Sequence, residues 1–148
     1  MPLQIRGAAG KDLPAVKQFL LNAGLGIEGL SEETVDHFLI MESEVGQVMG
    51  TLGIEKMAEN GLLRSLVVTS GQTQQDLLLL VSQACQFAME KEIARLFLAT
   101  NKQNAVSFFQ LLGFQVVERS SLPEELFTSE HMQSIATVDN SIFLKFSF

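Results

Sequence analysis

The chain has 148 residues, 47% of them hydrophobic, and a formal net charge of −7 at pH 7. This length and hydrophobicity suffice to bury a core, so we expect residues 1–148 to form a single globular domain. The acidic charge and the lack of clustered lysine and arginine argue against nucleic acid as the main ligand. The lone Cys85 excludes an internal disulfide framework and favours a reducing, cytoplasmic location, and no apolar run is long enough to cross a membrane.

The amino-terminal part of the chain is predicted to form a strand, a helix and a loop. Residues 3–6 read as a short strand. Asp12 is placed to cap a helix that ends near Asn22, because the apolar residues that follow Asp12 recur on one helical face. Residues 23–30 contain three glycines and are predicted to be a loop, with a weak helical signal after Ser31.

The middle of the chain has the clearest pattern. Residues 37–42, 48–55 and 62–68 are predicted strands, and residues 44–47 form the turn between the first two. Residues 73–91 form the best-defined helix, because their apolar residues follow the three-and-four spacing of a buried stripe.

The last third alternates again. We predict a strand at 96–99, a helix at 105–112 ended by Gly113, and strands at 114–118 and 141–148. The long connection from residue 122 to 140 is expected to be partly helical after Leu122. This order indicates an α/β fold with mixed strand directions.

Three segments in this order resemble the GNAT superfamily of N-acetyltransferases. They are Leu62–Val68, Phe108–Phe114 and Val117–Pro123. The pieces are most similar to the amino-acid acetyltransferase branch, which includes N-acetylglutamate synthase-like and arsinothricin-type resistance enzymes. The resemblance covers nearly the whole chain and implies a mixed central sheet splayed between its fourth and fifth strands and flanked by about four helices.

The resemblance also implies an activity, the direct transfer of an acetyl group from acetyl-CoA to the amine of a small amino-acid-like acceptor. The pantetheine arm would pair with the backbone near Leu66, Val67 and Val68, and Asn104 would contact CoA unless it only caps its helix. The pyrophosphate would sit at the amino end of the long helix, where free N–H groups and the helix dipole favour an anion. The residues there are Thr73, Gln74, Gln75, Asp76, Leu77 and Leu78.

This phosphate loop departs from the family pattern. Family members carry Gln or Arg, two residues, Gly, one residue, then Gly or Ala, whereas residues 73–78 contain neither small residue. Asp76 adds a negative charge, and two like charges at about 4 Å repel by roughly 4 kcal/mol at an effective dielectric near 20. Thr73 and Asp76 also have the spacing of a capping box, which would occupy the same N–H groups. Alternatively, Asp76 points to solvent and the backbone still binds phosphate.

The acceptor side needs a proton acceptor and a means of holding the substrate. Glu55, at the end of its predicted strand, is the first candidate for a base acting through water, and Glu28 is the second. Both can equally be solvated surface carboxylates. Arg64 is either turned to solvent or grips a substrate carboxylate, the role that the family resemblance favours. Ser65 should point to the opposite face by strand alternation.

The composition limits other chemistry. Many GNAT enzymes protonate the leaving thiolate with a tyrosine, but the chain has none, and the matching residue is Phe109. A thiol with a pKa near 8.5 is a tolerable leaving group without an acid. His37 and His131 have no partners at metal spacing, so no metal site is predicted.

Two questions stay open from the sequence. The rival to an enzyme is a weakly active or inactive GNAT-fold module that binds a metabolite or a partner protein, since fold alone does not establish activity. The apolar carboxy-terminal strand could pair across a homodimer or lie inside the sheet. Its apolar residues are Ile142, Leu144, Phe146 and Phe148.

Overall fold

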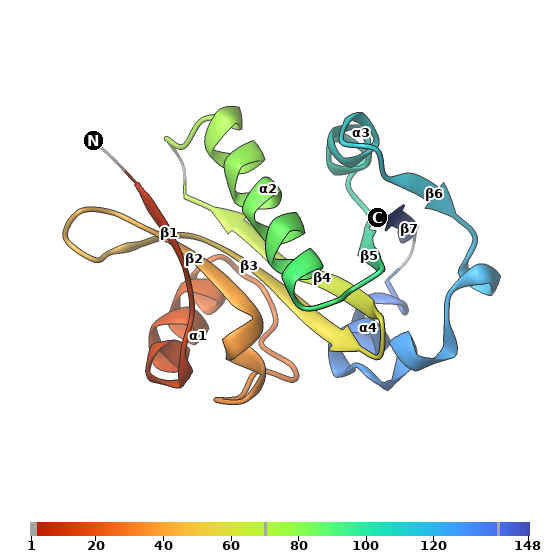
Figure 1. Ribbon diagram of the computed structural model, residues 1–148, viewed down its shortest axis with the longest axis horizontal. Helices are drawn as coiled ribbons and strands as arrows, with labels where there is room; N and C mark the ends of the chain where they lie inside the picture. Colours follow the sequence, from red (N-terminus) through yellow and green to blue (C-terminus); the bar gives the residue numbers. More distant parts are fainter. Residues whose placement is uncertain (1–2, 70, 139) are drawn as a thin grey trace.

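The computed structural model describes residues 3–69, 71–138 and 140–148. Within these ranges the strands form one seven-stranded sheet in the order β1-β2-β3-β4-β5-β7-β6 (Figure 1). The strands are β1 (Gln4–Gly7), β2 (Phe38–Glu42), β3 (Val48–Met57), β4 (Asn60–Val68), β5 (Arg95–Thr100), β6 (Gln115–Val117) and β7 (Ile142–Ser147). The α-helices are α1 (Leu13–Asn22), α2 (Gln74–Glu90), α3 (Gln103–Leu111) and α4 (Glu130–Ile135).

The strand directions follow from the connections. β4 and β5 run parallel because α2 carries the chain back between them, whereas the other neighbouring strands of the described sheet are antiparallel. The predicted α/β class, with a mixed central sheet and about four helices, is confirmed. None of the helices in the described ranges has the length and apolar character needed to cross a bilayer.

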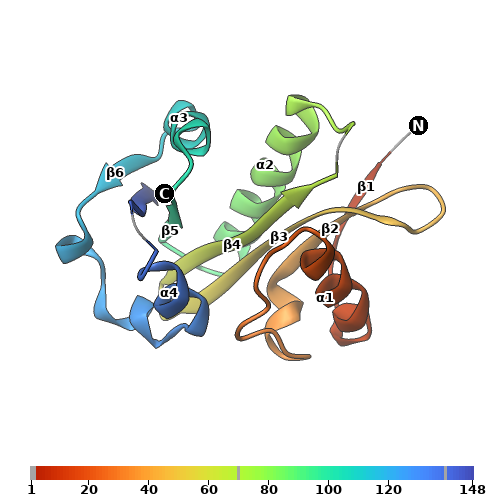
Figure 2. The same ribbon diagram turned by 180° about the vertical axis from the view of Figure 1, so that it is seen from behind.

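The helices cover both faces of the sheet. α2 and α3 lie on the face toward the viewer in Figure 1, while α1 and α4 lie on the face shown in Figure 2. The predicted stripe of α2 provides the core on its face, with Leu80, Val81, Ala84 and Ala88 buried against the sheet. On the other face, Val16 and Leu20 of α1 pack against β2.

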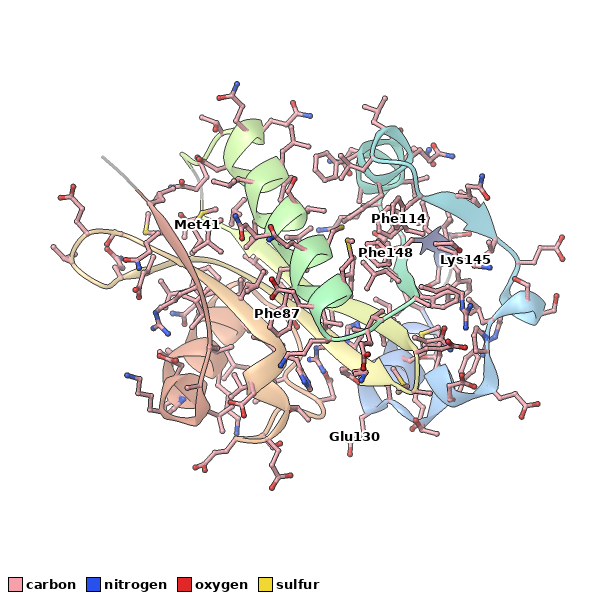
Figure 3. The ribbon with its side chains drawn as sticks, viewed as in Figure 1. Met41, Phe87, Phe114, Glu130, Lys145 and Phe148 are labelled. Carbon is pink, nitrogen blue, oxygen red and sulfur yellow. The ribbon has the colours of Figure 1, made fainter. Side chains whose placement is uncertain are left out.

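A row of phenylalanine rings joins α3 to the carboxyl end of the chain. Phe109, Phe114, Phe146 and Phe148 follow one another with ring centroids 5.1–5.3 Å apart, and Figure 3 labels Phe114 and Phe148 beside β7. Aromatic pairs at this separation add stability beyond the area that they bury. The row holds α3 close to β7 and β5, and therefore sets one wall of the site described below.

The structure corrects two predictions about the elements, the end of β3 and the start of the last helix, and settles where the carboxy-terminal strand lies. β3 continues to Met57, so Glu55 lies within the strand, opposite Leu62, and not at its end. In the long connection, a 3-10 turn occupies Glu124–Thr128 and the α-helix begins only at Glu130. β7 is internal, between β5 and β6, so its paired residues cannot pair across subunits.

Candidate functional site

The sheet splays open between β4 and β5. These strands pair only over their first residues, and the last paired residues are Leu62 and Phe97. β4 then continues to Val68 bonded only to β3, while β5 continues to Thr100 bonded to β7 (Figure 1). The edge of β4 that faces β5 therefore has no strand partner beyond Leu62, and such an edge presents free N–H and C=O groups. The predicted splay between the fourth and fifth strands is confirmed.

A β-bulge at Ser65 changes the course of β4 within this opening. Thr51 pairs with Val67 and Gly53 with Arg64, so two residues of β4 lie opposite one residue of β3. Ser65 has φ of 59°, which costs a non-glycine residue about 1–3 kcal/mol and persists only where neighbours impose it. The buried Thr51 hydroxyl donates to the Ser65 carbonyl at 2.9 Å and so fixes the bulge.

The bulge also overturns the expectation that Arg64 and Ser65 point to opposite faces. Arg64 Nε donates to Ser65 Oγ at 2.9 Å, in a buried contact. Alternation holds only in regular strand backbone, and the positive φ of Ser65 interrupts it.

Two adjoining cavities border the open edge of β4. The central cavity, of about 350 Å³, is lined by residues of β4, β5, α3 and α4, and the outer cavity, of about 430 Å³, lies between the amino ends of α2 and α3. Both are lined by Leu66, Lys102, Ala105 and Phe109, so they meet along β4 and α3. The central cavity is completed by Leu25, Leu52, Leu63, Arg64, Ser65, Leu98, Ala99, Thr100, Asn101, His131 and Ile135. The outer cavity is completed by Val68, Gln72, Thr73, Gln74, Leu77, Asn104 and Phe108.

Arg64 is buried in the lining of the central cavity and is held by several partners. Its side chain is 1% exposed, and Nη1 forms an ion pair of 2.8 Å with Glu55 Oε2. Nη1 also donates to the Glu28 carbonyl, and Nη2 makes a long contact of 3.5 Å with the Gly26 carbonyl. The interpretation that Arg64 is turned outward to solvent is therefore wrong. Arg64 ties β3 and β4 to the loop that follows α1.

The two predicted carboxylates lie at different places around Arg64. Glu55 is partly buried, with its side chain 18% exposed, and shares the ion pair. Glu28 is exposed, and only its backbone carbonyl contacts Arg64. Neither residue lines the central cavity. Their catalytic role stays a prediction.

The predicted cofactor residues are brought together in part. Six of them, Leu66, Val68, Thr73, Gln74, Leu77 and Asn104, line the outer cavity. Val67 instead packs with the α1 cluster on the other face, and Gln75, Asp76 and Leu78 do not line the cavity. Asn104 does not cap α3, because the N-cap residue is Lys102.

The amino end of α2 is closed by its own side chains. The Thr73 hydroxyl accepts from the Asp76 N–H at 3.1 Å, and Asp76 Oδ2 accepts from the Thr73 N–H at 3.0 Å. This is the predicted capping box. Two backbone donors that an anion would use at this helix end are therefore already paired.

The comparisons with known proteins fit this architecture. The chain is 33% identical to the uncharacterized protein YwlB of Bacillus subtilis (strain 168) over 144 residues, covering 96% of this chain and 95% of YwlB. The chain belongs to the YwlB family. No model of a known protein family matches it.

Solved structures identify the fold. N-acetylglutamate synthase from Neisseria gonorrhoeae, complexed with coenzyme A and N-acetyl-glutamate, superposes with a TM-score of 0.79 at 22% identity over 99% of this chain. The chain spans only 35% of the length of that synthase. A GNAT-family acetyltransferase from Staphylococcus aureus Mu50 matches with a TM-score of 0.76 at 16% identity over 99% of both chains. The fold of this YwlB-family chain is therefore the GNAT fold, as the sequence resemblance predicts.

Two residues that line the cavities were not predicted as site residues from the sequence. His131, in the first turn of α4, lines the central cavity, and Lys102 lines both cavities. Burial and the nearby Arg64 charge lower the pKa of His131 to about 4, against the opposing effect of Glu55 and Glu28. His131 is therefore a neutral imidazole at pH 7.

A third hollow, of about 540 Å³, lies elsewhere, between residues 116–119, 136–138 and 140–143. Its guanidinium, Arg119, is already engaged, since it donates to the Ala136 carbonyl at 2.9 Å and lies 5.5 Å from the Phe127 ring centroid. The opening between β4 and β5 is therefore the better candidate for the functional site, because it combines an unpaired strand edge with titratable side chains.

Proposed function

We propose that this chain is an N-acetyltransferase that moves an acetyl group from acetyl-CoA directly to the amine of a small amino-acid-like acceptor. The observation that carries the proposal is the unpaired edge of β4 bordered by two adjoining cavities. This arrangement suits a long cofactor that lies along the strand edge and delivers its thioester to the central cavity. The fold is shared with an N-acetylglutamate synthase crystallised with coenzyme A.

The residues present fit such a cofactor along most of its length. The backbone of Leu66 and Val68 at the open edge would pair with pantetheine amides, and N–H groups near the bulge would polarise the thioester carbonyl. Lys102 is the charged residue among those that line the outer cavity, where it would attract phosphate. The self-capped end of α2 is the one part that fits poorly.

The proposed acceptor is amino-acid-like because Arg64 lines the central cavity. A guanidinium has five N–H donors, and the contacts of Nη2 with the described residues are limited to the 3.5 Å approach to the Gly26 carbonyl. Nη2 would therefore be the donor to a substrate carboxylate, while Nε and Nη1 keep their structural partners.

The proposal predicts acetyl-CoA-dependent acetylation of at least one common amino acid. The assay incubates the protein with acetyl-CoA and each of the twenty L-amino acids in turn, and follows thiol release and the mass gain of one acetyl group. Glutamate is the reference acceptor because the superposed synthase was crystallised with N-acetyl-glutamate. Thiol release without any acetylated product, or no release at all, would contradict the proposal.

A second candidate is a GNAT-fold module that binds a metabolite or partner with little or no catalysis. The capping box at Thr73 and Asp76 favours it, because it occupies donors that a diphosphate would need. The two candidates differ in whether CoA binds tightly enough for turnover.

Replacing Asp76 with glycine is expected to strengthen CoA binding by about tenfold or more, which corresponds to about 1.4 kcal/mol. The change removes a negative charge and frees the Thr73 N–H. Helix stability should fall by about 1 kcal/mol, because a cap is lost and glycine enters the helix. Calorimetric titration with CoA measures the first effect and thermal unfolding the second.

Asp76→Asn is the matched control, because it removes the charge and keeps an oxygen acceptor for the cap. An intermediate gain in affinity would assign part of the effect to charge. Equal CoA affinity in wild type and Asp76→Gly would show that the capped end does not limit binding.

Assembly and location remain predictions. If the chain forms a homodimer, the free sheet edge at the carboxyl-terminal side is β6, where Val116 is 50% exposed. A cytoplasmic location is proposed from the single Cys85, which is half-buried against the α2 core, where burial raises the pKa of its thiol.

A further inference from the structure

His131 is the histidine among the residues that line the central cavity. α4 presents it to the same cavity as Arg64, Ser65 and Leu66 of β4, the residues of the bulge. The residue is half-buried, and its ring nitrogens make no hydrogen bond within the described ranges. No buried side-chain nitrogen in these ranges lacks a partner, so the ring nitrogens of His131 reach solvent. A polar ring that faces a cavity without a protein partner is free to bond a ligand.

The other lining residues cannot accept a proton near neutral pH. Arg64 and Lys102 are cations, and the remaining polar lining side chains, Ser65, Thr100 and Asn101, do not titrate in that range. Glu55 and Glu28 contact or flank Arg64 but do not line the cavity. His131 is therefore the lining side chain with an unprotonated imidazole nitrogen at pH 7.

We propose that His131 accepts the proton from the acceptor nitrogen during acetyl transfer. This inference rests on the proposed function and replaces Glu55 with a residue that lines the reaction cavity. Arg64 (β4), Glu55 (β3), Glu28 (the loop after α1) and Lys102 (at the start of α3) are the charged groups that face or surround it.

The step conserves atoms and charge. The acceptor reacts as its free amine, whose lone pair bonds to the thioester carbonyl carbon and leaves positive charge on nitrogen. His131 takes one N–H proton, the carbonyl re-forms, and the C–S bond breaks to release CoA thiolate. The imidazolium then gives the same proton to the sulfur, so the products are the amide and CoA thiol and His131 ends neutral.

The lowered pKa of His131 makes proton uptake from nitrogen the harder half of this step and favours the second half. An imidazolium with a pKa of about 4 is a much stronger acid than a thiol with a reference pKa near 8.5. Proton return to sulfur is therefore downhill. The chain contains no tyrosine to do this, and Phe109 lines the cavity at the position where many GNAT enzymes have one.

The test compares three variants with wild type, using acetyl-CoA and the L-amino acid that wild type acetylates fastest in the panel above. His131→Gln should lower kcat by about 10²–10⁴-fold, with the KM for acetyl-CoA and the Kd for CoA unchanged. Glu55→Gln should lower kcat less than about tenfold, because an amide oxygen can still accept from Arg64. His37→Gln is the matched control and should leave kcat unchanged, since His37 lies beside Phe87, away from the cavity.

A second variant at His131 separates a chemical role of the ring from a structural one. His131→Gly removes the ring, and added imidazole should restore a measurable part of kcat, which no structural role would produce. Equal kcat in wild type and His131→Gln, a large loss confined to Glu55→Gln, or no imidazole rescue would overturn the inference. Absence of turnover in wild type would instead contradict the proposed function itself.

Discussion

Replacing Arg64 with leucine is expected to lower the free energy of unfolding by about 3–5 kcal/mol, the usual cost of removing one partner from a buried ion pair. The change leaves the Glu55 carboxylate without its 2.8 Å partner and deprives Ser65 Oγ and the Glu28 carbonyl of their donor. The bulge at Ser65 would lose one of the two side chains that hold it. Equilibrium unfolding in urea, followed by circular dichroism, measures the loss.

Arg95→Leu is the control for this prediction. Arg95 pairs with Glu59 near the surface, with the two side chains 34% and 64% exposed, and its Nε donates to the buried Asn60 Oδ1 at 2.9 Å. Its loss should therefore cost about 1–2 kcal/mol, less than the loss of Arg64. Adding Glu55→Leu to Arg64→Leu should recover part of the stability, because the unpaired carboxylate is removed. A similar loss for Arg64→Leu and Arg95→Leu would show that the buried pair does not hold the site together.

Replacing Ala105 with tryptophan is expected to weaken acetyl-CoA binding by about 100-fold or more, or about 2.8 kcal/mol. Ala105 lines both cavities where they meet, so a large ring there would fill the passage in which we propose that the cofactor binds. Isothermal titration calorimetry measures the affinity, and thermal unfolding verifies that the variant is folded.

Gln110→Trp is the matched control on the same helix. Gln110 is exposed and does not line either cavity, so the same ring at this position should leave acetyl-CoA affinity unchanged. Wild-type affinity in Ala105→Trp would place the cofactor outside the two cavities and contradict the proposed binding mode.

The regular elements were predictable because their signals are local. The apolar stripe of α2 and the Thr73–Asp76 cap can both be read within one stretch of chain, and both are confirmed. The α2 crossover then requires β4 and β5 to be parallel. The family resemblance, which the solved structures confirm for the fold, supplied the splay between those strands.

The details of the site depend on contacts that the sequence does not display. The bulge at Ser65 exists because Thr51 and Arg64 hold a backbone conformation that serine rarely adopts alone. His131 reaches the cavity only because the long connection folds back as α4, a six-residue helix without a clear apolar period. Glu55 was misplaced at a strand end because β3 continues to Met57.

The two ends of the proposed cofactor site differ in the same way, since one depends on a local motif and the other on contacts between distant segments. At the phosphate end, the capping of α2 could be predicted from the sequence, because the spacing of Thr73 and Asp76 is that of a capping box. The reaction end combines α4, β4 and the loop after α1, which are far apart in sequence and meet around Arg64 and His131. The sequence therefore indicated the first end and named Arg64 at the second, but not His131.

The gap between β4 and β5 is the proposed binding site of a thioester cofactor. A crystal structure of the protein soaked with acetyl-CoA would show whether the cofactor binds there. We predict pantetheine density along the edge of β4 at Leu66 and Val68, the acetyl group in the central cavity near His131, and the diphosphate in the outer cavity beside Lys102. An empty gap at millimolar acetyl-CoA, or density for the cofactor at another surface, would contradict the account.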